Sequence, residues 1–317
     1  SATARGQHDR ASAKNLRHFR GPTRILSRSG APDRVDTSAL NNLPHSATPL
    51  IGRDHELTEL RALLTESGVR LLTLAGAAGV GKSRLGLEVA ASALSAYPDG
   101  VWWIDLAHTP DAVDVVARIR AALQVDDDAD ESSAAVLSHL ESKHLLLLLD
   151  NCEPLTRATA DVVHHILAAA RAVTILATSR ESLHLPGERI WYAQALAAPP
   201  QAELAMSIDT LPPGDQASYV ARLAEYDAVR LFVERAQAAQ PGFELTPSTA
   251  GVVGDICRQL EGLPRAIVLA AERSRVLSVG QIATTLGDLV RQPRRRAHAA
   301  TTAERSLRTG LEWSHGR

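Results

Sequence analysis

A glycine-rich segment between an apolar run and a helical pattern constrains the fold of this chain more than any other feature. Residues 76–83 read G-A-A-G-V-G-K-S and match the phosphate-loop pattern G-x-x-x-x-G-K-[ST]. The apolar run before them predicts a buried parallel strand, and Leu87, Ala90 and Leu94 after them follow a helical spacing. A strand, a glycine loop and a helix in this order direct backbone N–H groups and a helix N-terminus at an anion. The segment therefore predicts a phosphate site in an α/β fold.

The residue types in this loop suit the chemistry of a nucleotide phosphate. Glycine has no Cβ, so a loop rich in glycine can wrap closely around a phosphate group. Lys82 is expected to reach the β- and γ-phosphates, and the hydroxyl of Ser83 is expected to ligate Mg²⁺. The expected phosphate-binding residues are Gly76, Ala77, Ala78, Gly79, Val80, Gly81, Lys82, Ser83 and Arg84.

The composition favours a protein of helices and parallel strands. Of the 317 residues 45% are hydrophobic and 3% aromatic, and the apolar residues are mainly Ala, Leu and Val, which argues against a β-sandwich. The net charge of −2 gives no overall field that would steer the chain to nucleic acid or a membrane, and no apolar stretch reaches the length of a membrane span. Cys152 and Cys257 match no metal spacing and fit a reducing cytoplasm as buried small apolar residues.

The order of apolar and polar patterns predicts the fold class. Strands are expected at residues 70–75, 101–106, 145–149, 173–178 and 189–195, with helices at 83–96, 111–123, 131–142 and 155–171. Continuous apolar strands that alternate with helices predict a three-layer α/β phosphate-loop domain with a mostly parallel five-stranded sheet. The later pattern is helical and predicts a small all-α domain.

These patterns divide the chain into five segments. The first, residues 1–46, is basic and is interpreted as a disordered linker rather than a nucleic-acid-binding arm. Residues 47–198 are expected to form the α/β domain, 199–221 a linker or loop, and 222–290 the helical domain. Residues 291–317 are expected to be a linker and the start of a third domain, because Trp313 lacks a packing partner. The chain begins at Ser1 and its only methionine is Met206, so we expect it to be processed, trimmed or part of something longer.

A second chemical element follows the apolar run at residues 145–149. Asp150 is expected at the carboxyl end of that strand, where ligands of open α/β sheets bind, and could hold Mg²⁺ beside Ser83. The alternative role is that of a cap for the next element. Hydrolysis also needs a group that orients water, and Asn151 cannot act as a general base. Glu153 is the nearest alternative, with a catalytic and a structural role weighted equally.

Arg180 follows the fourth expected strand, and at that edge it could contact a γ-phosphate and report its presence. The alternative is a surface arginine that extends over the sheet edge. Together with Lys82, Asp150 and Glu153 it completes the set of candidate catalytic residues. His164 and His165 have no ligand partners at a suitable spacing and are interpreted as structural, and the sequence contains no zinc pattern and no G-x-S-x-G turn.

Several separate segments together resemble the NB-ARC-like ATPase module of signal-transduction (STAND) NTPases, in particular the module of actinobacterial regulators of the LuxR and AfsR type. The matching segments begin at residue 42 and keep the family's order and spacing to the end of the chain. They are NLP at 42–44, LIGRD at 50–54, the loop at 76–83, PDGVW at 98–102, LDNCE at 149–153, ATSRE at 177–181, PGE at 186–188, AVRLF at 228–232, ICR at 256–258, GLP at 262–264 and LEWS at 311–314.

The resemblance implies a role for each matching position. The turn formed by Ile51, Gly52 and Arg53 would touch adenine, and Pro264 would close over the base and the sugar. The metal and sensor roles considered above agree with those of the family. Nucleotide would lie between the α/β and helical domains, and exchange or hydrolysis would change the angle between them. Such modules are slow switches that hold ADP at rest and ATP when active.

The sequence departs from the family pattern at three places. Arg265 stands where the family usually has Leu, and a cation in the first turn of a helix opposes the helix dipole, so this side chain is either exposed or in contact with phosphate. Val268 stands where the family usually has Glu. The winged-helix domain that should follow has only begun at residues 307–313, so the final segment would be the start of a truncated winged helix.

We therefore expect a cytoplasmic switch module that binds ATP or ADP with Mg²⁺, hydrolyses ATP weakly and forms part of a transcriptional regulator. The alternative is a truncated remnant that binds nucleotide weakly, or not at all, and does not switch. A metabolic phosphoryl-transfer kinase ranks third, because no acceptor site is visible. The expected partners are the nucleotide, a second copy of the chain or a partner protein, and DNA only through domains outside this chain. We expect no membrane partner.

Overall fold

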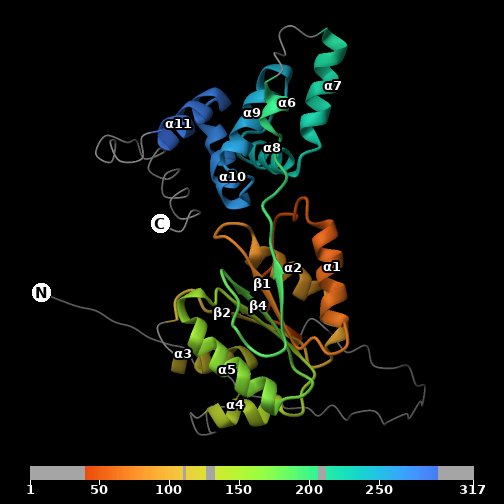
Figure 1. Cartoon of the computed structure of the whole chain (residues 1–317), viewed down its shortest axis with the longest axis vertical. Coiled ribbons are helices and arrows are strands. Elements are labelled where there is room, and N and C mark those ends of the chain that lie inside the picture. Colours follow the sequence, from red (N-terminus) through yellow and green to blue (C-terminus); the bar gives the residue numbers. More distant parts are fainter. Residues whose placement is uncertain (1–39, 110–111, 126–132, 206–211, 292–317) are drawn as a thin grey trace, which may run out of the picture. The chain divides into compact units, whose positions relative to one another are not determined.

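The computed structural model describes residues 40–109, 112–125, 133–205 and 212–291 (Figure 1). Most of the expected basic linker lies outside these residues, and so does the expected start of a third domain. The described residues form one sheet with its helices, followed by a group of further helices.

Five parallel strands form the sheet, in the order β2-β3-β4-β1-β5, which confirms the predicted α/β fold (Figure 1). The strands are β1 (Leu71–Ala75), β2 (Val101–Asp105), β3 (Leu146–Asp150), β4 (Thr174–Ser179) and β5 (Glu188–Tyr192). β1, β3 and β4 are buried along their whole length, which explains why their sequences are nearly continuous apolar runs. The parallel register places Asp105 beside Asp150 at the carboxyl ends of β2 and β3.

Alternate side chains of each strand pack into two different cores, one on each face of the sheet. Leu146 and Leu148 pack with α1 and α2, whereas Leu147 and Leu149 pack with α3, α4 and α5. These helices are α1 (Asp54–Thr65), α2 (Lys82–Ser92), α3 (Ala112–Leu123), α4 (Ser133–Leu140) and α5 (Thr156–Ala169). Two short 3-10 turns, η2 (Leu94–Ala96) and η3 (Glu153–Leu155), complete this part. Cys152 is buried in the second core and Cys257 among the later helices, and burial raises the pKa of both thiols.

The remaining helices pack around their own apolar core. That core includes Phe232, Ile256 and Ile267, all fully buried. The helices are α6 (Gln201–Leu204), α7 (Pro213–Ala224), α8 (Asp227–Ala239), α9 (Pro247–Gln259), α10 (Pro264–Ala271) and α11 (Val279–Arg291), with the 3-10 turn η5 (Glu272–Arg275) between the last two.

The stretch that we expected to be a linker or loop, residues 199–221, contains α6 and most of α7 instead. The two adjacent prolines at its centre suggested a loop, but Pro213 lies in the first turn of α7, where a helix tolerates proline. Tyr219 and Leu223 are buried and pack with Ala250 of α9, so tertiary contacts stabilise this helix.

Gly262 joins the helices to the segment that leaves the sheet. It follows α9 with a φ of +67°, and its carbonyl accepts a hydrogen bond from the N–H of Leu196 at 2.9 Å. A Cβ at this position would lie 2.1 Å from the carbonyl oxygen of Leu196. Glycine is therefore required both by the left-handed backbone and by the close approach of a second backbone segment.

Replacement of Gly262 by Ala should destabilise the fold by about 2 kcal/mol or more, because it combines a strained φ with a backbone clash. Urea unfolding followed by circular dichroism measures this change. Gly287→Ala is the matched control, because Gly287 lies within α11 and a Cβ there meets nothing within 4 Å. Alanine at that position should be neutral or stabilising by up to about 1 kcal/mol. Equal stability of the two variants would contradict this account of the junction.

Candidate functional site

The phosphate loop lies between the end of β1 and the start of α2, as the sequence predicts. Gly81 caps α2 with a φ of +98°, a conformation that few other residues adopt. The first turn of α2 contains no acidic residue and begins with Lys82. The N-terminus of α2 and the loop backbone can therefore receive an anion without competition from a carboxylate in that turn.

Lys82 is buried at the base of this loop. Its Nζ donates hydrogen bonds to the carbonyl oxygens of Gly76, at 2.9 Å, and Ala77, at 3.1 Å, and lies 3.6 Å from Oε1 of Glu153. Burial lowers the pKa of Lys82 below the usual value for lysine, although Glu153 opposes this shift. The structure therefore brings two of the predicted catalytic residues, Lys82 and Glu153, within reach of each other.

Asp150 ends β3 and is held by its neighbours in the sheet. Its Oδ1 accepts a hydrogen bond from the Thr178 hydroxyl, and its Oδ2 accepts one from Asn151 Nδ2 at 3.3 Å. Asn151 Nδ2 also donates to Asp105 Oδ1 at 2.8 Å, and the backbone N–H of Asn151 donates to Thr178 Oγ1 at 3.0 Å. Three parallel strands thus contribute to one polar network at their carboxyl ends. Within it Asn151 acts as a bridge between two carboxylates.

The donor set near the loop suits a hard divalent cation. The Asp150 carboxylate is buried, and Asp150 and Ser83 line the same cavity, so a carboxylate and a hydroxyl oxygen face one space. Mg²⁺ prefers such oxygen ligands and completes its shell with phosphate and water oxygens. Within the described ranges no group of three or more His, Cys, Asp or Glu residues is arranged to hold a metal. These residues therefore fit Mg²⁺ that arrives with a phosphate ligand, rather than a cage built from protein alone.

Arg53 connects three parts of the structure. It is buried, and its Nη2 donates to the carbonyl oxygens of Gln194, at 2.6 Å, and Val80, at 3.3 Å, while Nη1 pairs with Glu56 at 2.7 Å. The predicted contact turn thus anchors the phosphate loop and the segment that leads to the helices. Most of the guanidinium's hydrogen-bonding capacity is used by the protein itself.

Two other predicted residues also have protein partners. Gly52 faces Asp227 of α8, since a Cβ at Gly52 would lie 2.3 Å from the Cγ of that side chain. Arg84 donates hydrogen bonds to the hydroxyl and the carbonyl of Thr48. These contacts tie the start of the ordered chain to α8 and α2.

One cavity of about 650 Å³ joins the loop to the later helices. The first turn of α10 forms its opposite wall, where the N–H of Arg265 donates to the carbonyl oxygen of Gly79 at 3.2 Å. The cavity brings together most of the predicted site residues: Ile51, Arg53, Ala78, Gly79, Val80, Gly81, Lys82, Ser83, Arg84, Asp150, Glu153, Arg180 and Pro264. Gly52, Gly76 and Ala77 do not line it, although the latter two hold Lys82 through their carbonyls.

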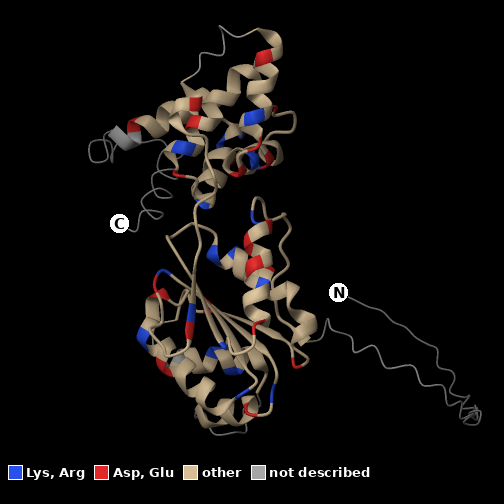
Figure 2. Cartoon of the chain, turned by 45° about the vertical axis from the view of Figure 1, so that its right-hand side comes forward, with Lys and Arg blue, Asp and Glu red and all other residues tan. Residues whose placement is uncertain are grey.

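The cavity lining is strongly basic. Six basic side chains and two acidic ones line it: Arg53, Lys82, Arg84, Arg180, Arg235 and Arg265 against Asp150 and Glu153. Elsewhere basic and acidic residues are mixed over the described elements, as Figure 2 shows, and the whole chain has a net charge of −2. The positive charge is therefore local, and it suits a ligand with several negative charges.

Sequence reasoning did not identify several residues of this site. Thr178 orients Asp150, and Leu231 and Arg235 line the cavity from α8. Leu231 and Arg235 are four residues apart and so share one helix face, but the spacing does not say what that face meets. Asp105 carried a signal that was available, since it ends a predicted strand as Asp150 does.

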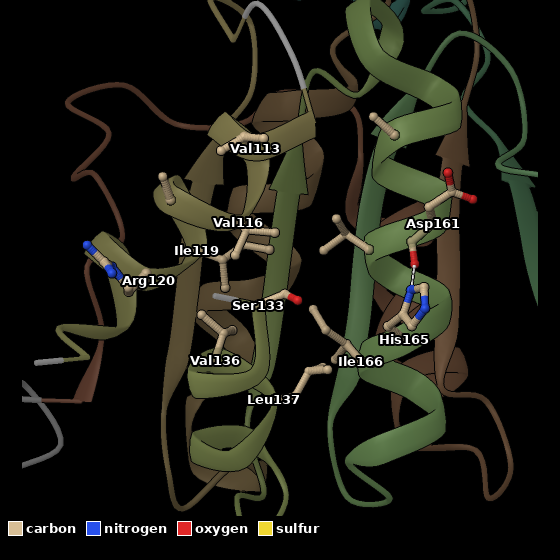
Figure 3. Close-up of a pocket in the computed structure, with 13 residues that line it drawn as sticks. Val113, Val116, Ile119, Arg120, Ser133, Val136, Leu137, Asp161, His165 and Ile166 are labelled. Atoms are coloured by element: carbon tan, nitrogen blue, oxygen red, sulfur yellow. Dashed lines mark hydrogen bonds between the residues drawn. The ribbon is translucent and has the colours of Figure 1, made fainter. Parts of the chain in front are cut away.

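A second cavity, of about 550 Å³, lies among α3, α4 and α5 and is mostly apolar (Figure 3). Val116 and Ile119 of α3 and Ile166 of α5 contribute to its wall. His165, which the sequence suggested to be structural, hydrogen-bonds through Nδ1 to the carbonyl oxygen of Asp161 at 2.7 Å. The groups that line this cavity supply no nucleophile paired with a base, so it is not a candidate active site. Among the described helices, none is both long and apolar enough to cross a membrane.

Comparison with known proteins agrees with this geometry. Residues 53–183 match the model of the NB-ARC domain. A protein of Mycobacterium tuberculosis (strain ATCC 25618 / H37Rv), named as a candidate HTH-type transcriptional regulator, is 35% identical over 257 residues, which are 81% of this chain and 26% of that protein. The regulatory protein AfsR of Streptomyces griseus is 26% identical over 290 residues, again 26% of that protein and 86% of this chain. The chain thus spans about a quarter of the length of these two relatives.

Among solved structures, a signal transduction ATPase with numerous domains and a tetratricopeptide repeat sensor, from Pyrococcus horikoshii, aligns with 84% of this chain and 45% of that chain. The sequence identity is 13% and the TM-score is 0.37. The match to the family model has a different basis, since it covers the phosphate loop, Asp150 and Arg180 in one continuous range. This chain therefore carries an NB-ARC domain, over residues 53–183.

Proposed function

We propose that this chain is a nucleotide switch module that binds ATP or ADP with Mg²⁺ in the cavity between the phosphate loop and α10. One observation carries the proposal. The buried Lys82 and the loop form one wall of a basic cavity, and the first turn of the helical part forms the opposite wall. A ligand in this position would touch both parts of the chain, which is what a switch requires.

The phosphates of the nucleotide would lie against the loop. Lys82 and the backbone N–H groups at the start of α2 would bind them, and Arg180 would contact the terminal phosphate. Mg²⁺ would bind at Ser83 and Asp150 and would neutralise part of the phosphate charge. Thr178 would keep the Asp150 carboxylate in place for this role.

The apolar end of the cavity suits the base and the sugar. Ile51, Leu231, Pro264 and Val268 line it, and they come from segments far apart in the sequence. Apolar side chains on both sides of a flat ring are a common way to bind a nucleobase. The family resemblance assigns adenine to the turn at residues 51–53, and two of those three residues reach the cavity wall.

The helical part would respond to the state of the nucleotide. Arg265 and Pro264 contact the phosphate loop, at a hydrogen bond of 3.2 Å to Gly79 and a separation of 3.8 Å from the Cβ position of Gly81. A ligand that binds one arrangement of these walls better than another shifts the population between them. We propose that hydrolysis is weak, because Asn151 bridges two carboxylates and cannot act as a base.

We further propose that the module regulates transcription as part of a longer protein. The named relatives in M. tuberculosis and Streptomyces griseus support this role, although this chain spans only 26% of each. DNA contact would then reside in parts of those proteins that this chain does not align with. Self-association or a partner protein would transmit the switch.

Replacement of Lys82 by Ala should weaken ATP binding by at least about tenfold, because it removes a charged hydrogen-bond donor to phosphate. Competition with a fluorescent ATP analogue measures the affinity. Lys143→Ala is the matched control, because Lys143 is partly exposed, pairs with Asp99 and lies outside the cavity. If wild type and Lys82→Ala bind ATP equally, or wild type does not bind it, the proposal is wrong.

Thr178→Val should reduce the dependence of ATP binding on Mg²⁺, because the Asp150 carboxylate loses the donor that holds it. The gain in affinity on adding Mg²⁺ should shrink by about threefold to tenfold, as expected for one lost hydrogen bond to a charged group. Thr178→Ser keeps the hydroxyl and should behave like wild type. An unchanged Mg²⁺ response in Thr178→Val would show that Asp150 does not serve the metal.

Glu153→Gln should have opposite effects on ATP binding and on turnover. The carboxylate now pairs with Lys82 and would repel phosphate, so its loss should raise ATP affinity a few-fold, or about 1 kcal/mol. If Glu153 orients the attacking water, turnover should fall by about a hundredfold. Single-turnover hydrolysis of labelled ATP measures the rate, with Glu66→Gln, at an exposed pair with Arg189, as the control. Unchanged turnover in Glu153→Gln would restrict Glu153 to a structural role.

A further inference from the structure

We infer that Arg265 is a phosphate-binding residue carried by the helical part, so that α10 recognises the charge of the nucleotide as well as its base and sugar. This inference rests on nucleotide occupying the cavity, as proposed above. It assigns to this chain a contact at the position where the family usually has an uncharged leucine.

The first observation is the position of Arg265. It is the second residue of α10, and its backbone N–H donates to the carbonyl oxygen of Gly79, within the phosphate loop, at 3.2 Å. The residue before it, Pro264, lies 3.8 Å from the Cβ position of Gly81. The first turn of α10 is therefore held directly against the loop, and the exposed side chain of Arg265 lines the same cavity as Lys82 and Ser83.

The second observation is the charge at the start of α10. The first turn of this helix contains no acidic residue and carries Arg265, although a cation there opposes the helix dipole. The start of α2 has the same pattern, with Lys82 and Arg84 and no acidic residue. Two helix N-termini with cations in their first turns thus border one cavity. An anion between them would offset the unfavourable charge at both helices, whereas an uncharged ligand would not.

The neighbours of Arg265 strengthen this argument. Val268, one turn further along α10, lines the cavity beside it, and Leu231 of α8 contributes to the same wall. Apolar surroundings exclude water and increase the energy of a charge–phosphate contact. A guanidinium also forms two parallel hydrogen bonds with a phosphate group, which a leucine cannot provide.

The contact would give the switch an electrostatic term. Arg265 is attached to α10 and the phosphates are held by the loop, so each added phosphate charge would draw the two walls together more strongly. The ligand class that this arrangement favours is a nucleoside polyphosphate over the nucleoside itself. The number of phosphates would then be read by the helical part directly, in addition to any reading by Arg180 on the sheet.

The test compares three ligands and four proteins, all as full chains. ATP, ADP and adenosine compete with a fluorescent ATP analogue on wild type, Arg265→Leu, Arg265→Lys and the control Arg230→Leu. Arg230 lies on α8, is 52% exposed, pairs with Asp227 and does not line the cavity. Arg265→Leu should weaken ATP by about tenfold and ADP by less, while adenosine changes by less than about twofold. Arg265→Lys should keep most of the ATP affinity, and Arg230→Leu all of it.

A second readout separates a charge contact from a change in shape. The ATP affinity of wild type should fall more steeply with added salt than that of Arg265→Leu, because the variant has one charge contact fewer. Arg265→Gln, which keeps a polar side chain, provides the same comparison if the leucine variant does not fold.

Two results would overturn the inference while leaving the proposed function intact. One is an unchanged ATP affinity in Arg265→Leu, and the other is an equal loss for ATP and adenosine. Failure of the proposed function itself gives a different pattern, since wild type would then bind no ATP or Lys82→Ala would bind it as well as wild type.

Discussion

The contact between the first turn of α10 and the phosphate loop is the interaction on which the rest of this site depends. Two backbone hydrogen bonds define it. Leu196 donates to Gly262 on one side of the turn, and Arg265 donates to Gly79 on the other. Between them Pro264 packs near Gly81. Without these contacts the loop would border open solvent, and the cavity would have only one wall.

A buried guanidinium reinforces this arrangement from the opposite side. Arg53 binds the carbonyl oxygens of Val80, in the loop, and Gln194, in the segment that leads to the helices, and it pairs with Glu56. A buried charge is costly unless its hydrogen bonds are made, so loss of any of these partners is unfavourable. The position of the segment that leads to the helices is therefore coupled to the position of the loop. The same side chain that the family resemblance assigns to adenine thus also has a structural role.

Much of the sheet and of the phosphate site could be predicted from the sequence because both depend on local patterns. Continuous apolar runs predict buried parallel strands, and the carboxyl ends of parallel strands meet at one edge of the sheet. That rule is sufficient to place Asp150 near Lys82, although they are far apart in the chain. The rule does not extend to α7, where adjacent prolines suggested a loop and the burial of Tyr219 and Leu223 decided for a helix.

The sequence by itself determined the phosphate loop, the strand that ends at Asp150 and the α/β class, since each rests on the chemistry and spacing of neighbouring residues. Only the tertiary structure decided which helical residues face the loop. A helix presents several faces, and the choice among them depends on packing between segments separated by more than a hundred residues. The structure thereby brings Arg265 to Gly79, and Thr178 to Asp150, through contacts that no local pattern encodes.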